Sequence, residues 1–121
     1  ASLIVRQEHL ASQLKSSLLP PVLATPIMIL VMENAALDAI RPFLDEDESA
    51  VGTVVDVRHI APTPIGQQIT AEARVVEVSD RRIVFAVAAR DEVEDIGSGT
   101  HERTVVDLQR IARRLKAKSR S

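Results

Sequence analysis

The feature that most constrains this chain is the stretch from Thr25 to Arg41, TPIMILVMENAALDAIR, which predicts one helix of about four turns. Thr25 can serve as the N-cap, Pro26 suits the first helical position, and Pro42 prevents continuation. Residues 27–32 are all apolar, and later residues continue the apolar surface. Because a helix of this kind is normally buried on most sides, we expect the rest of the chain to wrap around it.

One acidic residue interrupts the apolar surface of this predicted helix. Asn34, Asp38 and Arg41 recur at i, i+4 and i+7 and form an ordinary solvent-facing stripe, but Glu33 lies outside it. The residues three and four positions from Glu33 are apolar: Ile29, Leu30, Ala36 and Leu37. Since burial of an unpaired carboxylate is costly, Glu33 is either paired or used in chemistry. A carboxylate at the rim of the core that reaches water is the alternative.

The segment before this helix predicts less regular structure. Residues 2–8 predict a short strand, and residues 9–19 predict a helix with leucines every four residues. Pro20 and Pro21 then end regular structure. The apolar segment 18–24, LLPPVLA, leads into the main helix and predicts either a lid over a pocket or a connector packed on the core.

After the main helix, four stretches alternate with a period of two, which is typical of strands: residues 51–59, 68–78, 82–90 and about 95–108. An acidic loop at 45–48 precedes them, and a turn at 79–81 joins the middle two into a hairpin. In the first stretch, the odd positions from Val51 onward predict a core-facing row that ends in His59. Gly97 and Gly99 in the last stretch indicate a bulge or a place where another backbone or a ligand comes close.

This order of elements predicts a single α+β domain over residues 1–121, with an antiparallel sheet of about five strands curled around one long helix. Such a sheet leaves its edges open, so we expect a homodimer, with a tetramer as a further alternative. Residues 108–118 are expected to continue as a short helix, which forms most of a basic tail over 108–121.

Composition excludes several classes of protein. The chain has no cysteine, so thiol catalysis and disulfides are excluded. Residues 108–121 hold six basic residues and no acid, which leaves 9 basic and 17 acidic residues elsewhere, and Phe43 and Phe85 are the only Phe, Tyr or Trp. This balance argues against nucleic-acid binding. No apolar run is long enough to span a bilayer and no secretory leader is present, so we expect a cytoplasmic protein without a membrane partner.

Three side chains are candidates for chemistry: Thr25 at the helix start, Glu33 two turns along it, and His59 at the end of the strand row. Around one pocket they would suffice to hydrolyse an activated acyl compound, with Glu33 or His59 taking a proton from water and the helix N-terminus facing the oxyanion. Spacing does not show that they meet, and an N-cap threonine and a rim histidine are the alternatives. The sequence has no zinc-type spacing, phosphate loop or G-x-S-x-G elbow, so no metal or nucleotide is expected.

Three segments carry a resemblance to a known family: LATPIMILVMENAA, VGTVVDVRHIAPTPIG and IGSGTHERTVV. Across roughly residues 20–108 they resemble, in the same order, segments of the fluoroacetyl-CoA thioesterase family of hotdog-fold thioesterases. The resemblance implies a hotdog fold and a dimer that binds an acyl-CoA thioester near the subunit interface, with no cofactor apart from the CoA of the substrate. By motif position it implies catalytic roles for Thr25, Glu33 and His59, and it places Gly52 beside the thioester.

The chain also departs from that family. Members specific for fluoroacetyl-CoA resemble one another in phenylalanines on the lid and helix start, where this chain has Leu19, Leu23 and Ile27, and Pro26 stands where they have glycine. An aliphatic pocket that includes Leu23 suits a short or medium acyl chain, so we expect an acyl-CoA thioesterase without a fixed acyl preference.

The sequence also suggests which residues bind CoA, and it leaves two alternative functions open. Arg103 and the basic tail are candidates for binding the phosphates of CoA. The first alternative function is a non-catalytic acyl-CoA-binding hotdog protein, since fold does not determine function. The second is a hotdog enoyl-CoA hydratase or dehydratase, which would act on its thioester without freeing CoA.

Overall fold

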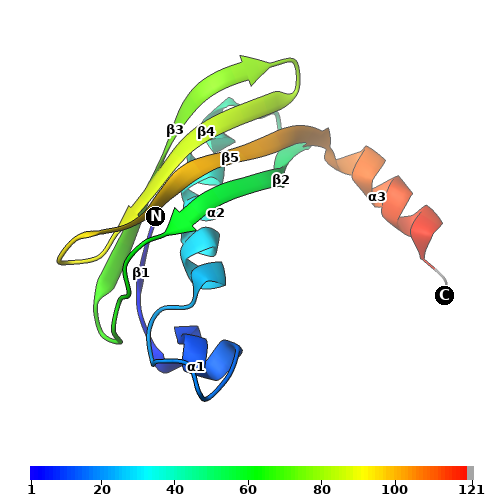
Figure 1. Cartoon of the computed structure of the whole chain (residues 1–121). Coiled ribbons are helices and arrows are strands. Elements are labelled where there is room, and N and C mark those ends of the chain that lie inside the picture. The colour runs from blue at the N-terminus through cyan, green and yellow to red at the C-terminus, as the bar shows by residue number, and fades with distance from the viewer. Residues whose placement is uncertain (120–121) are drawn as a thin grey trace.

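A computed structural model, which describes residues 1–119, shows one antiparallel sheet curled around a single long helix (Figure 1). The strands are β1 (Ser2–Ile4), β2 (Glu48–His59), β3 (Gln68–Ser79), β4 (Arg82–Arg90) and β5 (Asp95–Asp107). The helical elements are η1 (Gln7–His9), α1 (Ala11–Leu14), α2 (Thr25–Ile40), η2 (Arg41–Phe43) and α3 (Leu108–Lys118). The sheet order is β1-β3-β4-β5-β2, so the predicted α+β arrangement with five strands is confirmed.

The helix α2 begins and ends close to the predicted residues, but its cap differs from the prediction. Ala24 is the N-cap, and no side chain makes a capping hydrogen bond. The prediction that Thr25 caps the helix is therefore wrong, because Thr25 is already the first helical residue and its hydroxyl has another partner. Pro42 lies in the 3-10 turn η2 that follows Ile40, which agrees with its predicted role as a stop signal.

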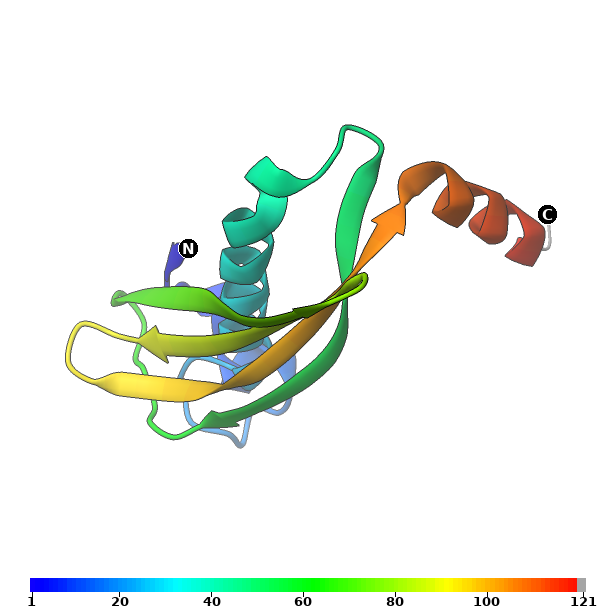
Figure 2. The ribbon, with the colours of Figure 1, turned by 90° about the horizontal axis from the view of Figure 1, so that it is seen from above.

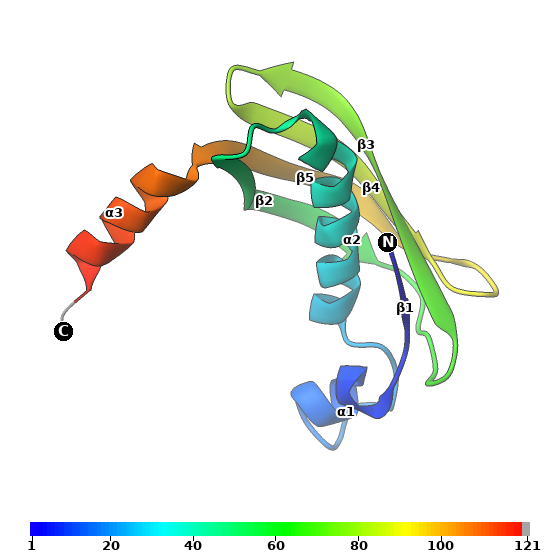
Figure 3. The ribbon, with the colours of Figure 1, turned by 180° about the vertical axis from the view of Figure 1, so that it is seen from behind.

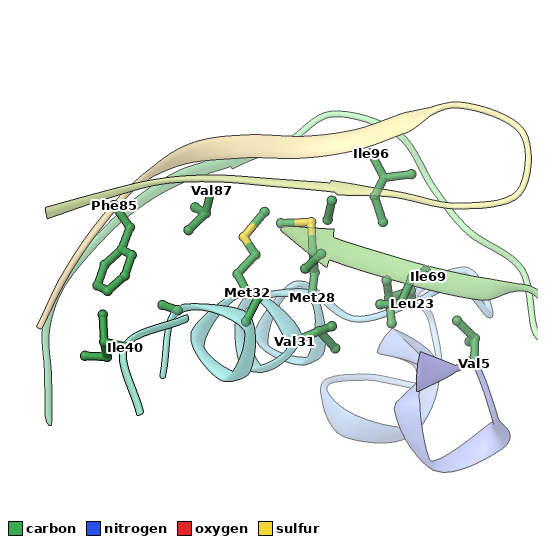
Figure 4. Packing of buried hydrophobic residues seen from close by; sticks show 14 of the residues in the cluster. Val5, Leu23, Met28, Val31, Met32, Ile40, Ile69, Phe85, Val87 and Ile96 are labelled. Carbon is green, nitrogen blue, oxygen red and sulfur yellow. The ribbon is translucent and has the colours of Figure 1, made fainter. Parts of the chain in front are cut away.

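The hydrophobic core lies between α2 and one face of the sheet (Figures 2 and 3). Figure 4 shows Met28 and Met32 pointing from the helix toward the strands, and both are fully buried. Complete burial of such a side chain contributes about 1.5–3 kcal/mol. The opposite side of the helix is open in the single chain, where Leu30 remains 45% exposed. The expectation of a helix buried on most sides is therefore met only on the side that the sheet covers.

A bulge in β2 changes which residues of that strand face the helix. The register of β2 against β5 shifts immediately after Gly52, which is paired with Arg103, whereas Val55 beyond the shift is paired with His101. Both partners on β5 are buried. Because the side-chain period of a strand is two, the inserted residue moves the inward row from even to odd positions. The prediction that Val51 belongs to the inward row is therefore wrong, whereas the row beyond the bulge still leads to His59.

The two glycines of β5 mark close approaches, as predicted. A Cβ on Gly97 would lie 2.6 Å from the sulfur of Met28 and 2.7 Å from the carbonyl oxygen of Arg58. A Cβ on Gly99 would collide with the backbone of Asp56. Since real side chains do not tolerate such contacts, these glycines allow β5 to pack closely against α2 and β2.

The segment before α2 is less helical than predicted. Only Ala11–Leu14 forms a helical turn, and the predicted helix over 9–19 is wrong in its second half. Leu10 instead pairs with Leu23 in a short antiparallel bridge, and Leu18 is 94% exposed. The bridge holds this segment against the residues that lead into α2, so tertiary pairing overrides the leucine repeat.

The helix α3 has the predicted bounds and extends away from the sheet (Figure 1). Asp107 caps it by accepting hydrogen bonds from the backbone N–H groups of Gln109 and Arg110. Its apolar residues are largely exposed, including Leu115. Within residues 1–119, no helix has the length and hydropathy needed to cross a membrane.

Candidate active site

The hydroxyl of Thr25 and the imidazole of His59 form a hydrogen-bonded pair at the start of α2. The Thr25 Oγ1 to His59 Nδ1 distance is 2.8 Å. Thr25 comes from the first turn of the helix and His59 from the last position of β2, so the curl of the sheet brings them together. Two of the residues selected from the sequence are therefore neighbours in space.

A mainly apolar hollow of about 340 Å³ lies beside this pair. Its walls come from the segment before α2 and from the residues that follow β2: Ala11, Leu19, Pro20, Val22, Leu23, Thr25, His59, Ile60, Ala61 and Pro62. The apolar segment that was predicted as a lid or a connector thus forms one wall. Leu23, a predicted substrate-binding residue, contacts both this hollow and the core.

The imidazole of His59 is held in conditions that favour its neutral form. Burial lowers the pKa of His59 below the ordinary value of 6.5, because the charged ring is poorly solvated there. Its second nitrogen, Nε2, is buried and has no hydrogen-bond partner within residues 1–119. A backbone interaction with Ala61 partly opposes this lowering of the pKa. A neutral histidine beside a hydroxyl is suited to orienting a reacting group or exchanging a proton with it.

Glu33 lies in a second polar region, under the middle of β2. Its carboxylate Oε2 is 3.9 Å from Nη1 of Arg103, and its side chain is 36% exposed. The same oxygen lies against the backbone of Gly52, where a Cβ would approach it to 2.9 Å. Gly52 therefore gives the carboxylate room, and a side chain at this position would displace it.

Arg103 is buried and turned toward the interior. Its Nη2 donates to the carbonyl oxygen of Ala50 at 2.7 Å, and its Nη1 lies 3.2 Å from Nε2 of His101. Burial lowers the pKa of Arg103, and the nearby charge of Glu33 partly opposes this shift. The guanidinium still remains charged at neutral pH. The guanidinium lies beside the Glu33 carboxylate, and the contact with CoA phosphates expected for Arg103 stays a prediction.

The two polar regions are separate within one chain. Glu33 follows Thr25 by eight residues, which corresponds to about 12 Å along a helix axis. Gly52 and His59 are seven residues apart in β2, or roughly 23 Å along a strand. No hydrogen bond or ion pair joins Glu33 to His59 in the part of the chain that the structure describes. The single hollow expected from the sequence is thus divided into two places in the single chain.

His101 is the residue of this site to which the sequence analysis gave no role. It precedes Arg103 by two positions in β5, so both side chains point to the same face of the sheet. The period-two relation was visible in the sequence. What was missing was the direction of that face, which depends on how β5 pairs with β2 and β4.

Solved structures identify the class to which this fold and site belong. A mutant of a fluoroacetyl-CoA thioesterase, solved with fluoroacetate, matches with a TM-score of 0.92 at 33% identity, over 98% of this chain and 93% of that chain. A thioesterase superfamily member from Thermus thermophilus matches with a TM-score of 0.89 at 30% identity, over 98% and 89% of the two chains. A hot-dog-like protein from Thermanaerovibrio acidaminovorans, at 21% identity and a TM-score of 0.88 over 100% and 89%, supports the fold alone. The molecule is a hotdog-fold thioesterase.

Sequence comparisons define the family within this class. The family model described as fluoroacetyl-CoA-specific thioesterase matches residues 5–109. The fluoroacetyl-CoA thioesterase of Streptantibioticus cattleyicolor is 40% identical over 100 residues, which cover 83% of this chain and 72% of that protein. The chain therefore belongs to the fluoroacetyl-CoA-specific thioesterase family, and the predicted hotdog fold and family are confirmed.

Proposed function

We propose that this protein hydrolyses a short- or medium-chain acyl-CoA to a free acid and CoA. The observation that carries the proposal is the Thr25–His59 hydrogen bond at the rim of an apolar hollow. Related proteins support the choice of substrate, because one relative is a fluoroacetyl-CoA thioesterase and a mutant of such an enzyme has been solved with fluoroacetate and CoA.

In the proposed reaction, water attacks the thioester carbonyl while Glu33 takes a proton from it. The C–S bond then breaks, the CoA thiolate leaves, and the proton held by Glu33 returns to the thiolate or to solvent. Neutral His59 and the hydroxyl of Thr25 orient the carbonyl, and the N–H groups at the start of α2 face the developing oxyanion. Direct attack by the Glu33 carboxylate, followed by hydrolysis of the acyl-enzyme, is the second route open to the same residues.

The proposed acyl group is aliphatic, and the hollow has no special element that would recognise a substituent on it. The hollow presents Leu19, Val22, Leu23 and Ile60, which offer dispersion contacts and no polar group directed at a substituent. Because both phenylalanines of the chain lie outside this hollow, the aromatic lid of the fluoroacetyl-specific members is missing. We therefore propose no preference for fluoroacetyl-CoA.

We further propose a homodimer that completes the site, with pairing into a tetramer left open. The strand β2 is the last in the sheet, and Val51, Val54 and Val55 on it are exposed. Such an edge favours antiparallel pairing with a second copy. A two-fold axis near the middle of β2 would bring the His59 end of one strand toward the region of Glu33 and Gly52 in the other. Glu33 of one subunit would then act with Thr25 and His59 of the partner subunit.

The test of the activity is a thiol-release assay over saturated acyl-CoAs of increasing length. We expect release of CoA with a maximum at a short or medium chain. Saturable binding without release would instead identify a non-catalytic acyl-CoA-binding protein. Loss of enoyl absorbance from an enoyl-CoA, without free thiol, would identify a hydratase.

A further inference from the structure

The buried imidazole of His101 has no role in the reaction described above, yet it lies at the centre of the polar region around Glu33. It is 1% exposed and stacks on Phe85, with ring centroids 6.0 Å apart and planes inclined by 24°. Its Nδ1 lies 2.8 Å from the carbonyl oxygen of Val54, and its Nε2 lies 3.2 Å from Nη1 of Arg103. Both ring nitrogens are therefore engaged.

These two partners determine the protonation of the ring. A carbonyl oxygen only accepts hydrogen bonds, so Nδ1 of His101 must carry a proton and donate it to Val54. A guanidinium only donates, so Nε2 must be unprotonated and accept from Arg103. His101 is thus neutral, in the tautomer with hydrogen on Nδ1. A cationic ring, or the other tautomer, would direct an N–H at the guanidinium.

His101 in turn helps to hold the guanidinium of Arg103. That group is anchored at two points, the Ala50 carbonyl oxygen and Nε2 of His101. Its distance to the Glu33 carboxylate is 3.9 Å, which is longer than a hydrogen bond. The anchors therefore place the positive charge, and the Glu33 carboxylate forms an ion pair with it that is too long for a hydrogen bond.

We propose that His101 is a positioning residue of the thioesterase site, which acts through Arg103 to place the Glu33 carboxylate against Gly52. Without the acceptor at Nε2, Nη1 of Arg103 would turn to the Glu33 carboxylate, which lies 3.9 Å away. A direct hydrogen bond from Arg103 would then occupy the oxygen that takes the proton from water and would pull it from its place. This inference rests on the proposed role of Glu33 and assigns a function to a residue that does not touch the reacting atoms.

The first test reads the tautomer directly and requires no activity. In protein labelled with ¹⁵N at histidine, long-range ¹H–¹⁵N correlation spectra distinguish a protonated from an unprotonated ring nitrogen. We expect His101 to show a protonated Nδ1 and an unprotonated Nε2 at neutral pH. A cationic ring or a protonated Nε2 would overturn the inference.

The second test separates positioning from simple stability. His101→Leu removes the acceptor, whereas His101→Gln offers an amide oxygen to Arg103 and an N–H₂ group to Val54. The matched control is Val87→Ala, a truncation of a buried β4 residue whose register partners are Ala73 and Gly99. We expect His101→Leu to lower kcat by about 10- to 100-fold with KM nearly unchanged, because a misplaced catalytic group costs rate more than binding. His101→Gln should recover most of the rate.

Each outcome of this second test has one meaning. If His101→Leu loses no more kcat than Val87→Ala at an equal loss of melting temperature, His101 is only structural and the inference is wrong. The inference is also wrong if the kcat of His101→Gln is as low as that of a folded His101→Leu. If the leucine variant does not fold, the kcat of His101→Gln alone decides the question. Absence of thiol release by the unmodified protein would instead contradict the proposed function, and the tautomer measurement would still decide the geometry.

Discussion

The two polar regions of this molecule are held in different ways. At the rim of the hollow, Thr25 and His59 make one direct hydrogen bond of 2.8 Å. Under the middle of β2, Glu33 makes no hydrogen bond to Arg103 and is placed by its surroundings, namely the missing side chain at Gly52 and a guanidinium anchored elsewhere. The first region depends on one contact, whereas the second depends on packing. Substitutions should therefore affect them differently.

The largest effect is expected from Glu33→Gln, which keeps the shape of the side chain and removes the proton acceptor. Turnover should fall by about 100- to 10,000-fold, the usual contribution of a positioned general base. Thiol release from saturating acyl-CoA measures it. Asp38→Asn, on the exposed side of the same helix, is the control and should leave turnover unchanged. Unchanged thiol release from Glu33→Gln would remove this residue from the mechanism.

Gly52→Ala tests whether packing places the carboxylate. The new Cβ would lie 2.9 Å from Glu33 Oε2 and 3.2 Å from His101 Cε1, so one of these side chains must move. We expect kcat to fall by about 10- to 100-fold, as for a small displacement of a catalytic group. Thr100→Ala, an exposed position on β5, is the control. Wild-type kcat in Gly52→Ala would show that Glu33 tolerates displacement.

The pH dependence of kcat/KM tests the other region. Because burial lowers the pKa of His59 and its neutral form is proposed to act, activity should rise with pH through a midpoint below 6.5. Below that midpoint it should fall by about tenfold per pH unit. The residual activity of His59→Gln should lack this limb. A profile that instead falls as pH rises through the same range would mean that His59 acts as an acid.

Mixing two inactive variants tests whether the regions meet across the dimer. When Glu33→Gln and His59→Gln subunits are unfolded together and refolded, half of the dimers are mixed. If each site combines Glu33 of one subunit with His59 of the partner subunit, a mixed dimer keeps one intact site, so activity should recover to about a quarter of the unmodified level. No recovery, although mixed dimers are present, would place both residues of each site in one subunit.

The smallest effect is expected from removal of residues 109–121, which carry most of α3. If their basic side chains contact CoA phosphates, KM should rise by about two- to fivefold at low ionic strength, since exposed charge pairs contribute little. The rise should disappear at high salt because of screening. An equal KM for both forms at low salt would show that the helix does not contact CoA.

Local sequence patterns were sufficient to predict the two longest helices and the hairpin, whose residues are close together in the chain. The main helix, the hairpin β3–β4 and the helix α3 follow from periodicity and prolines, and the structure has them at nearly the predicted bounds. The segment at 9–19 failed because its repeat is overridden by the bridge between Leu10 and Leu23, which are far apart in sequence.

In the candidate site, the sequence predicted which residues are candidates but not which of them are in contact. Residue types and spacing marked Thr25 at the helix start, Glu33 on an apolar helix surface and His59 at the end of an apolar strand row. They could not show that the hydroxyl of Thr25 contacts His59 in place of capping its helix, nor that the bulge after Gly52 turns the inward row. His101 was given no role because a histidine in a strand becomes informative only when its neighbours are known.

The sequence by itself determined the main helix, the four long strands, the helix α3 and the residues capable of acid–base chemistry, because these follow from the periods of helices and strands and from side-chain type. Only the tertiary structure decided which of those residues meet. Strand register and a one-residue bulge set the direction of every side chain in β2 and β5, and such long-range pairing leaves no local trace in the chain.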